Sequence, residues 1–314
     1  MPAFEPPPDF HHLTVLRVET ISALALASGG VYVDVTLGGG GHTEAILRAH
    51  PGVRVIAFDR DPNAIRAAGA RLAEFADRIT LVQSRFSRIE QELERLGQRQ
   101  IDGLIADLGV SSPQLDEAER GMSFRREGPL DMRMDPTDGE TAADLLVRLS
   151  QDELADVIYT LGEERRSRRI ARCIKQALDA GELSTTTDLR RAIVRAVGPR
   201  RVGGIDPATR TFQALRLAVN RELEELGTLL SALPRVIRPG GHAALISFHS
   251  LEDRLVKRAF LERDAWERLS KKPVIASEIE QHDNPRSRSA KLRVARRQPP
   301  TLREEVYEEF DSDD

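Results

Sequence analysis

The chain has 314 residues, and at roughly 150 residues per domain this length predicts about two domains. Its single cysteine, Cys173, excludes an intrachain disulfide, and the sequence has no run of 18 apolar residues that could span a membrane. The histidines never cluster at zinc-ligand spacing, so we expect no metal site. The first ten residues have no apolar stretch and do not form a secretory signal. These features predict a protein of the reducing cytoplasm.

The net charge of −4 argues weakly against a nucleic-acid partner, but the charges are unevenly distributed. Residues 304–314 contain seven acids and no base, so the rest of the chain carries a net charge of +3. Residues 284–303 contain seven bases and no acid, and residues 162–203 contain eleven bases against five acids. Each basic segment is either a solvated face or a contact surface for RNA.

Apolar β-branched segments alternate with amphipathic segments over the first hundred residues. Strands are predicted at 31–37, 53–58, 79–83 and 101–108, and helices at 43–49, 62–76 and 88–97. Strands that alternate with helices imply right-handed crossovers and a parallel sheet that is covered on both faces. A fifth buried strand is predicted at 243–248, between helices at 211–236 and 251–263. Segments 273–279 and 290–296 are predicted edge strands.

The fourth and fifth predicted strands are separated by 132 residues, from Gly109 to Gly240. An ordinary crossover needs only a dozen or so residues plus its loops, so this region contains an insertion. Helical periodicity occurs at 141–149, 151–161, 163–180 and 187–197. We therefore predict a discontinuous sheet domain at 1–112 and 209–303, an inserted helical domain at 113–208, and an acidic disordered tail at 304–314.

The first strand runs into four glycines, Gly38 to Gly41, and then into a helix. Glycines at this place let the backbone turn sharply and approach a ligand closely. Asp59 ends the second strand 19 residues after Gly40, where an acid suits the hydroxyls of an adenosine ribose. The alternative is a simple glycine turn beside a solvated aspartate.

The dinucleotide fingerprint requires a third glycine, but the two positions where it would fall are Thr43 and Glu44. S-adenosylmethionine has no phosphate and carries a sulfonium cation. The acids around the loop, Asp34, Glu44, Asp59 and Asp107, suit a cation better than a pyrophosphate. The residues therefore favour a methyltransferase over a dehydrogenase.

Several long stretches resemble the bacterial small-subunit rRNA cytosine-N4 methyltransferase family (RsmH/MraW), in order along nearly the whole chain. They are VYVDVTLGGGGHTEAIL (31–47), FDRDPNAI (58–65), DGLIADLGVSSPQLDEAERGMSF (102–124), GPLDMRMDP (128–136), GEERRSRRIARCI (162–174), DPATRTFQALRLAVNRELEEL (206–226), ISFHSLEDRLVK (246–257) and NPRSRSAKLRVARR (284–297).

The resemblance implies an α/β class I Rossmann-like methyltransferase with an inserted all-helical domain. It implies that S-adenosylmethionine methylates the exocyclic N4 of a cytosine in the decoding region, at the P site, of 16S rRNA. The partner would be the small subunit, as an assembled or late-precursor 30S particle, and the sequence leaves a homodimer open. The cofactor contacts map onto Gly40, Gly41, His42, Asp59, Phe86, Asp107 and Gln114. Phe86 either flanks the adenine ring or is an ordinary core residue.

Methyl transfer to N4 needs a hydrogen-bond acceptor for the amino group as positive charge develops there. The candidates are Asp107, Ser111, Ser112, Asp131 and Asp135, and the two serines could instead cap a helix. Methylation at C5 would need a thiolate. The only thiol, Cys173, is predicted on the apolar face of a helix in the insert, which argues against C5 chemistry.

His249 follows the fifth predicted strand, where it either lines the pocket or lies in the core. Ser250 and Asp253 match a helix capping box. Asn284, Arg286 and Arg288 form a predicted phosphate-gripping loop for RNA. Arg165, Arg166, Arg168 and Arg169 in the insert either contact RNA or pair with Glu163 and Glu164.

Two other functions remain open from the sequence. One is a methyltransferase that acts on DNA or on a small molecule. The other is an assembly factor that binds the cofactor without turnover.

Overall fold

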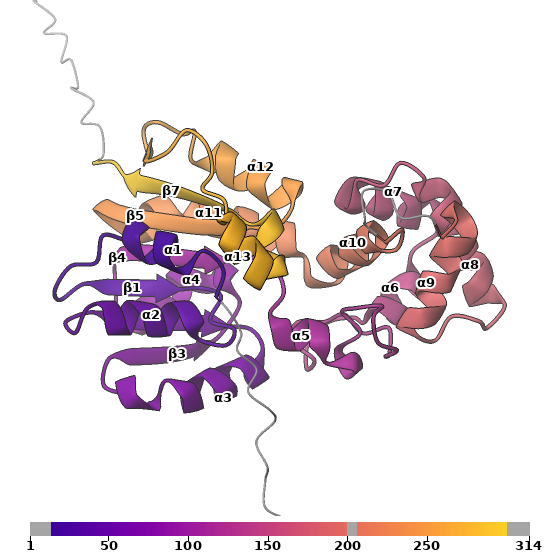
Figure 1. Cartoon of the computed structure of the whole chain (residues 1–314), viewed down its shortest axis with the longest axis horizontal. Helices are drawn as coiled ribbons and strands as arrows, with labels where there is room; N and C mark the ends of the chain where they lie inside the picture. The colour runs from indigo at the N-terminus through magenta and orange to yellow at the C-terminus, as the bar shows by residue number, and fades with distance from the viewer. Residues whose placement is uncertain (1–13, 200–205, 300–314) are drawn as a thin grey trace, which may run out of the picture.

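A computed structural model describes residues 14–199 and 206–299, and the predicted acidic tail lies outside them. The described chain forms one seven-stranded sheet with a separate group of helices beside it (Figure 1). The strand order is β3-β2-β1-β4-β5-β7-β6. The strands are β1 Val31–Asp34, β2 Arg54–Asp59, β3 Ile79–Gln83, β4 Ile101–Asp107, β5 Ile237–Ser247, β6 Trp266–Arg268 and β7 Lys291–Arg297.

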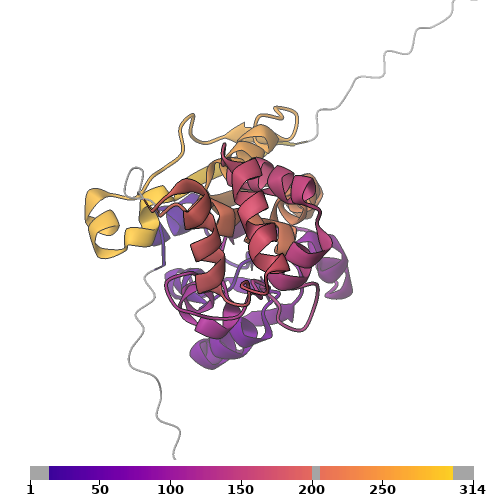
Figure 2. The same ribbon diagram turned by 90° about the vertical axis from the view of Figure 1, so that its right-hand side faces the viewer.

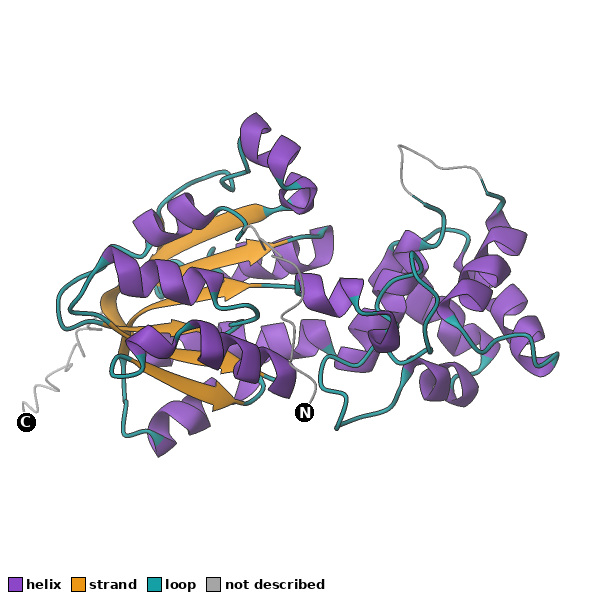
Figure 3. Cartoon of the chain, turned by 60° about the horizontal axis from the view of Figure 1, so that its bottom comes forward, coloured by secondary structure: helices purple, strands orange, loops and turns teal. Residues whose placement is uncertain are grey.

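The first five strands are parallel, whereas β7 and β6 are added antiparallel at one edge. The strand order reverses between β1 and β4, which pair with each other. From β1 the sheet continues to β2 and β3 on one side, and from β4 it continues to β5 on the other. In open α/β sheets, ligands bind outside the carboxyl ends of the strands at this reversal. Figure 3 shows that the carboxyl ends of the parallel strands point toward the inserted helices.

Successive residues of the central strands point to opposite faces of the sheet, and each face is buried under helices. Leu104 and Leu245 belong to one apolar core, and Ile105 and Ile246 belong to the other. The first face is covered by α4 Ile89–Arg95, α11 Glu222–Val236 and α12 Ser250–Ala259, and the second by α1 Arg17–Ala23, α2 Gly41–Ala49 and α3 Pro62–Arg71. Burial on both faces explains why these strands are continuously apolar.

The inserted helices form their own core and lie beyond the carboxyl edge of the sheet, facing the viewer in Figure 2. Four of them begin at capping boxes: Ser111 with Gln114, Thr141 with Asp144, Ser150 with Glu153, and Thr185 with Asp188. The helices between β4 and β5 that precede α11 are α5 Ser112–Asp116, α6 Ala142–Arg148, α7 Gln151–Gly162, α8 Ser167–Asp179, α9 Thr186–Val197 and α10 Thr209–Asn220.

The packing of α10 places the C-terminal boundary of the insert later in the chain than predicted. The predicted boundary at residue 208 assigns α10 to the sheet domain, but Phe212 and Leu215 of α10 are buried in the core of the insert. The predicted helix 211–236 is in fact two helices, because Arg221 takes a left-handed conformation with φ of 52°. The chain therefore returns to the sheet domain at Arg221.

Other predicted bounds also differ. The predicted edge strand at 273–279 is wrong: Val274 forms only an isolated bridge to Leu292, and α13 Glu278–Asp283 begins within the segment. The second antiparallel strand is β6 instead, which pairs with β7. The predicted strand 31–37 ends at Asp34, and the predicted helix 251–263 ends at Ala259. Of the described residues, no helix is long and apolar enough to cross a membrane.

Candidate cofactor and active site

The glycine loop connects β1 to α2 at the reversal of strand order. Gly38 and Gly40 have positive φ angles of 48° and 79°, a conformation that glycine adopts without steric cost. A Cβ on Gly41 would lie 2.0 Å from Oγ1 of Thr14, so the chain before α1 lies directly against the loop. The guanidinium of Arg71 donates to the Gly39 carbonyl at 2.9 Å and pairs with Glu44.

Three aspartates from three strands surround this loop. The buried Asp34 ends β1 and accepts hydrogen bonds from the Thr36 amide at 3.0 Å and the Thr43 hydroxyl at 2.8 Å. Burial raises the pKa of the Asp34 carboxyl. The Thr36 hydroxyl in turn accepts from the Asp107 amide at 2.6 Å. These bonds connect β1, the loop and β4 into one rigid wall.

Asp59 ends β2, and each of its carboxylate oxygens accepts one backbone amide. Oδ2 accepts from Gly38 at 2.8 Å, and Oδ1 accepts from Asp61 at 2.8 Å. Burial raises the pKa of Asp59 to about 6. Each oxygen retains lone pairs for further donors, so Asp59 can accept bonds from ribose hydroxyls.

His42 and Asp107 contain buried polar atoms without partners. Both ring nitrogens of His42 and Oδ1 of Asp107 lack a hydrogen-bond partner among the described residues. His42 Nε2 lies 3.6 Å from Asp107 Oδ2, which is too long for a hydrogen bond. Because burying an unpaired polar group is unfavourable, these atoms point to a polar ligand in this place.

The predicted cofactor residues therefore lie at one edge of the sheet. Phe86 opens a short helical turn after β3 and is partly buried against the first core. β3 pairs with β2 in a register that sets Gln83 beside Asp59. Gln114 of α5 is buried, and its Oε1 accepts from the Ser111 amide at 3.0 Å. Glu44 is the exception in the acidic group, because Arg48 and Arg71 neutralise it.

The chemistry of these groups fits S-adenosylmethionine. Two carboxylates, on Asp34 and Asp107, lie near the glycine loop, and Asp59 is free to accept from a ribose. No described Arg or Lys is hydrogen-bonded into the loop to neutralise a pyrophosphate except Arg71, which is already paired with Glu44. Carboxylates favour a cationic ligand over an anionic one.

The predicted acceptors for N4 differ in their surroundings. Asp131 is held by Arg133 through two contacts of 2.8 and 2.7 Å between side chains. Burial by itself acts to raise the pKa of Asp131, but the contacts with Arg133 outweigh burial, and the net effect is a lowered pKa. Asp135 accepts from Thr137. Ser111 is the N-cap of α5, and Ser112 is its first residue, of whose side chain the structure describes nothing.

His249 caps a helix. It is the N-cap of α12, and its Nδ1 accepts from the Glu252 amide at 3.4 Å while Nε2 lies 3.2 Å from the Glu252 carboxylate. The predicted capping box of Ser250 and Asp253 is wrong by one residue, because the box is formed by His249 and Glu252. Ser250 instead bonds to Glu163 of the insert, and Asp253 pairs with Arg293.

The predicted phosphate-gripping loop is more ordered than the sequence indicates. Asn284 is only 9% exposed and lies between α13 and the short helix Pro285–Ser289. Arg286 pairs with Asp116 of α5 at 3.1 Å, and Arg288 donates to the Gln281 carbonyl at 3.3 Å. Arg286 therefore lies near Gln114 and the cofactor edge, while Arg288 is directed back to α13.

The arginines of the insert fall into two groups. Arg166 donates to the Val197 carbonyl, and Arg168 pairs with Asp156 at 2.8 Å. Arg165, Arg169 and Arg172 are exposed, and their side chains make no hydrogen bond or ion pair to any residue that the structure describes. Arg169 and Arg172 lie three positions apart on one face of α8, and Arg165 lies in the turn just before the helix. Glu163 pairs with Arg254, and Glu164 with Arg210 at 3.9 Å.

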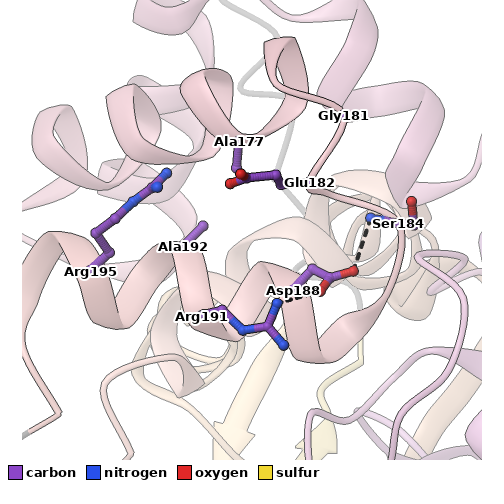
Figure 4. A pocket seen from close by; sticks show the side chains of 8 residues that line it. All are labelled: Ala177, Gly181, Glu182, Ser184, Asp188, Arg191, Ala192 and Arg195. Atoms are coloured by element: carbon purple, nitrogen blue, oxygen red, sulfur yellow. Dashed lines mark hydrogen bonds and ion pairs between the residues drawn. The ribbon is translucent and has the colours of Figure 1, made fainter.

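A hollow of about 550 Å³ lies elsewhere in the insert, between the end of α8 and α9 (Figure 4). Asp188 is committed to the start of α9 and to Arg191, and Arg195 donates to the Cys173 carbonyl. Acids and bases are mixed along its wall, and it shares no residue with the glycine loop. This hollow is therefore separate from the site at the glycine loop.

Sequence reasoning missed the residues that support this site. Asp61 and Arg120 form a buried ion pair of 2.7 Å below it. Asp61 carries a local signal, because it caps α3 ahead of a proline at the first helical position. Arg120 has none, since its partners are distant in the sequence.

Comparisons with known proteins find similarity along nearly the whole chain. The model of the MraW methylase family matches residues 9–298. The chain is 65% identical over 286 residues to ribosomal RNA small subunit methyltransferase H of Sorangium cellulosum, covering 91% of this chain and 90% of that protein. It is 51% identical to the protein of the same name from Synechococcus sp. strain CC9311, covering 94% and 96%. An rRNA methylase structure from Streptococcus thermophilus has a TM-score of 0.42 at 10% identity, covering 90% and 94%.

Proposed function

The chain belongs to the MraW methylase family, and on that premise we propose that it methylates the exocyclic N4 of a cytosine in the decoding region, at the P site, of small-subunit 16S rRNA. S-adenosylmethionine supplies an electrophilic methyl group on a sulfonium when bound. The observation that carries the cofactor part of this proposal is the set of unpartnered buried atoms of His42 and Asp107 at the glycine loop. The names of the relatives support the rRNA substrate.

We assign cofactor binding to Gly40, Gly41, His42, Asp59 and Asp107, with Phe86 and Gln114 at the adenosine side. The Gly38 amide orients the Asp59 carboxylate, which accepts from the ribose hydroxyls. The unpartnered atoms of His42 and Asp107 are available to the polar end of the cofactor. The fixed wall of Asp34, Thr36 and Thr43 holds these groups in place before the ligand binds.

Of the proposed N4 acceptors, Asp107 is favoured. The amino lone pair of cytosine is delocalised into the ring, so the enzyme must hold it in line with the methyl group. Correct positioning can supply about 7–11 kcal/mol. Asp107 has an unpartnered carboxylate oxygen at the carboxyl end of β4, whereas Asp131 is occupied by Arg133. Ser111 and Ser112 remain secondary candidates at the start of α5.

RNA contact is proposed for three exposed arginines, Arg165 just before α8 and Arg169 and Arg172 on one face of it. Arg286 beside α5 is a weaker candidate, because it pairs with Asp116. His249 and Asn284 are proposed to shape the substrate side of the site through their backbone and capping roles. Arg166, Arg168 and Arg288 already have partners in the protein, which weakens their assignment to phosphate. The target base must leave its stack to reach the cofactor, at a cost of a few kcal/mol.

The substrate particle is proposed to be the assembled or late-precursor 30S subunit in the cytoplasm, and a homodimer stays a prediction. The test incubates the protein with methyl-labelled S-adenosylmethionine and undermethylated small subunits, followed by digestion to nucleosides. We expect label only in N4-methylated cytidine. Label in another nucleoside, or in parallel reactions with DNA or metabolites, would contradict the proposal. Binding of the cofactor without transfer would instead indicate an assembly factor.

A further inference from the structure

A buried polar cluster lies directly beneath the cofactor edge and reaches into the insert. It consists of Asp61, Gln114 and Arg120, with exposed fractions of 2%, 7% and 8%. Charged side chains are rarely buried this deeply unless they are paired. Each of the three comes from a different part of the chain: the start of α3, α5, and the short 3-10 helix Ala118–Arg120 at the entrance to the insert.

Asp61 is the common partner of the cluster. Its Oδ2 accepts from Nη1 of Arg120 at 2.7 Å and from Nε2 of Gln114 at 3.1 Å. Its Oδ1 accepts from the Asn63 amide at 3.0 Å, which caps α3. The Asp61 amide donates to Asp59, the ribose acceptor. One residue therefore contacts two proposed cofactor residues and Arg120.

Arg120 carries the contact onward to the insert. Its Nη2 donates to the carbonyls of Met134 at 2.6 Å and Arg133 at 3.2 Å, and its own carbonyl accepts from the Met132 amide at 3.0 Å. Met132 has a positive φ of 63°, and the side chains of Met132 and Met134 lie in the insert core. The guanidinium thus holds this segment by its backbone.

Residues 132–134 are also hydrogen-bonded to the end of α10, where the chain returns to the sheet domain. The buried Asn220 side chain accepts from the Met134 amide at 2.8 Å and donates to the Met132 carbonyl at 2.7 Å. Asn220 ends α10, immediately before the chain re-enters the sheet domain at Arg221. Its carbonyl accepts from Nη1 of Arg60, which follows Asp59, at 3.3 Å. Both connections between the two parts of the molecule meet at residues 132–134.

We propose that Arg120 is a positioning residue that couples an occupied cofactor pocket to the placement of the helical insert. The identity of the cofactor rests on the proposed function. Asp59 and Gln114 both hydrogen-bond to Asp61, which pairs with Arg120. A ligand that bonds to Asp59 and Gln114 therefore restrains two neighbours of Asp61. This restraint fixes the Asp61 carboxylate. It thereby also fixes Arg120, which is hydrogen-bonded to the backbone of residues 132–134. Because coupling between sites is reciprocal, placement of the insert also favours the cofactor.

A purely structural ion pair would behave differently. Removing one partner of a buried pair destabilises a protein whether or not a ligand is present. The coupling instead predicts that the ligand changes the opening of residues 130–134, and that Arg120 is needed for this change. The test therefore compares ligand-free and ligand-bound protein within each variant, which cancels the loss of stability.

The experiment is amide hydrogen exchange with mass spectrometry on the full chain, with and without S-adenosylhomocysteine. In the unmodified protein we expect the ligand to slow exchange at least threefold both in the glycine loop, 38–42, and in 130–134. In Arg120→Met the loop should still be protected at saturating ligand, while the response at 130–134 falls to less than half. Arg120→Lys keeps a positive charge beside Asp61 but has no second nitrogen to donate to the carbonyls of Arg133 and Met134. The ligand response at 130–134 should therefore also fall by at least half in this variant.

Arg190→Met is the matched control. Arg190 pairs with Asp206 inside the insert at 2.9 Å and stacks over Phe124, away from the Asp61 cluster, so its response at 130–134 should be unchanged. A full response in either folded Arg120 variant would overturn the proposal, and so would loop protection without any response at 130–134 in the unmodified protein. Failure of the ligand to bind the unmodified protein would contradict the proposed cofactor as well.

Discussion

At the scale of single residues, the cofactor edge is set by how burial acts on its acids. Asp59 has few partners for its charge beyond two backbone amides, and burial raises its pKa to about 6. Glu44 lies close in sequence to the same loop, yet its two arginine partners outweigh its partial burial and lower its pKa. Two acids near one loop therefore titrate in different ranges, so pH can test one without the other.

Cofactor affinity should depend on pH through Asp59. Its ionised form accepts from the ribose hydroxyls, so the affinity for S-adenosylhomocysteine should fall by about tenfold per pH unit below about pH 6. Asp59→Asn should make the profile flat in this range. Asp59→Ala at pH 8 should weaken binding by about 1–3 kcal/mol through the lost charge-assisted bonds. Isothermal titration calorimetry from pH 5 to 8 measures all three, and an unchanged slope in Glu44→Gln is the control.

The Asp59 carboxyl also affects the stability of the protein, with the opposite dependence on pH: low pH weakens cofactor binding but favours the folded state. Its pKa is higher in the folded protein than the ordinary value of 3.8, so the folded state binds more protons between about pH 4 and 6. The contribution of Asp59 to the free energy of unfolding is therefore present at low pH and is lost as the pH rises through about 6. Urea unfolding of Asp59→Asn should lack this component. A profile identical to that of the unmodified protein would show that Asp59 titrates normally.

At the scale of secondary-structure elements, α8 shows how a charge run divides once it is folded. The helix buries Ile170 and Ile174, and this orientation fixes which arginines meet a partner. Arg168 reaches Asp156 of α7, whereas its neighbour Arg169 faces away and has no described side-chain partner. The exposed pair contributes little to stability, so both residues can be replaced without unfolding the helix.

Replacing Arg165, Arg169 and Arg172 together by alanine should weaken binding to small subunits by about tenfold or more and reduce its salt dependence. Each lost phosphate contact lowers the slope of log affinity against log salt by about 0.9. The neighbours Arg168 and Arg169 provide a matched comparison, in which only Arg169→Ala should reduce the slope. Filter binding at several salt concentrations measures this. Equal slopes in the two single variants would remove α8 from the RNA surface.

The junction of α10 and α11 depends on a left-handed residue that is not glycine. Arg221 has φ of 52°, a conformation that costs an ordinary residue about 1–2 kcal/mol. Arg221→Gly should leave the free energy of unfolding unchanged or raise it by up to about 1 kcal/mol. Arg221→Val should lower it by about 1–2 kcal/mol, because a β-branched residue tolerates this region poorly. Urea denaturation measures both effects.

Glu224→Gln is the control for Arg221, since it removes the exposed ion pair between the two side chains and leaves the backbone unchanged. Its free energy of unfolding should change little. A loss in Glu224→Gln as large as in Arg221→Val would assign the effect to the ion pair.

At the scale of the whole molecule, the two parts have separate cores that meet at the carboxyl edge of the sheet. Specific polar contacts cross between them. Glu163 at the end of α7 bonds to Ser250 and Arg254 of α12, and Arg286 pairs with Asp116. The ion pairs Asp61–Arg120 and Arg85–Asp138 also cross, so several polar contacts join the cofactor edge to the insert.

The acidic segment 304–314 masks the charge of the rest of the chain. Its removal changes the net charge from −4 to +3. A more positive protein should bind non-cognate nucleic acid more tightly at low salt, while methylation of the specific site continues. Affinity for an unrelated single-stranded RNA, measured beside methyl transfer, tests this. Unchanged non-specific affinity in the shortened chain would show that these acids do not act on RNA binding.

The sequence by itself determined the alternation of strands and helices, the presence of an insert and the identity of the loop residues. These features are local: burial of the strands requires apolar runs, a tight turn requires glycine, and capping boxes mark helix starts. The ends of elements were less predictable. Segment 273–279 has the composition of a strand, but only the arrangement of β5, β6 and β7 decides which segment pairs at the edge.

Only the tertiary structure decided which residues work together. Asp61, Arg120 and Asn220 are separated by 59 and 100 positions, yet they join Asp59 and Gln114 to residues 132–134. No periodicity or spacing signals such contacts, because a buried polar group is satisfied by whatever the fold brings within about 3 Å. The fold likewise decides that Arg168 meets a partner and Arg169 meets none among the described residues, and apolar packing assigns α10 to the core of the insert.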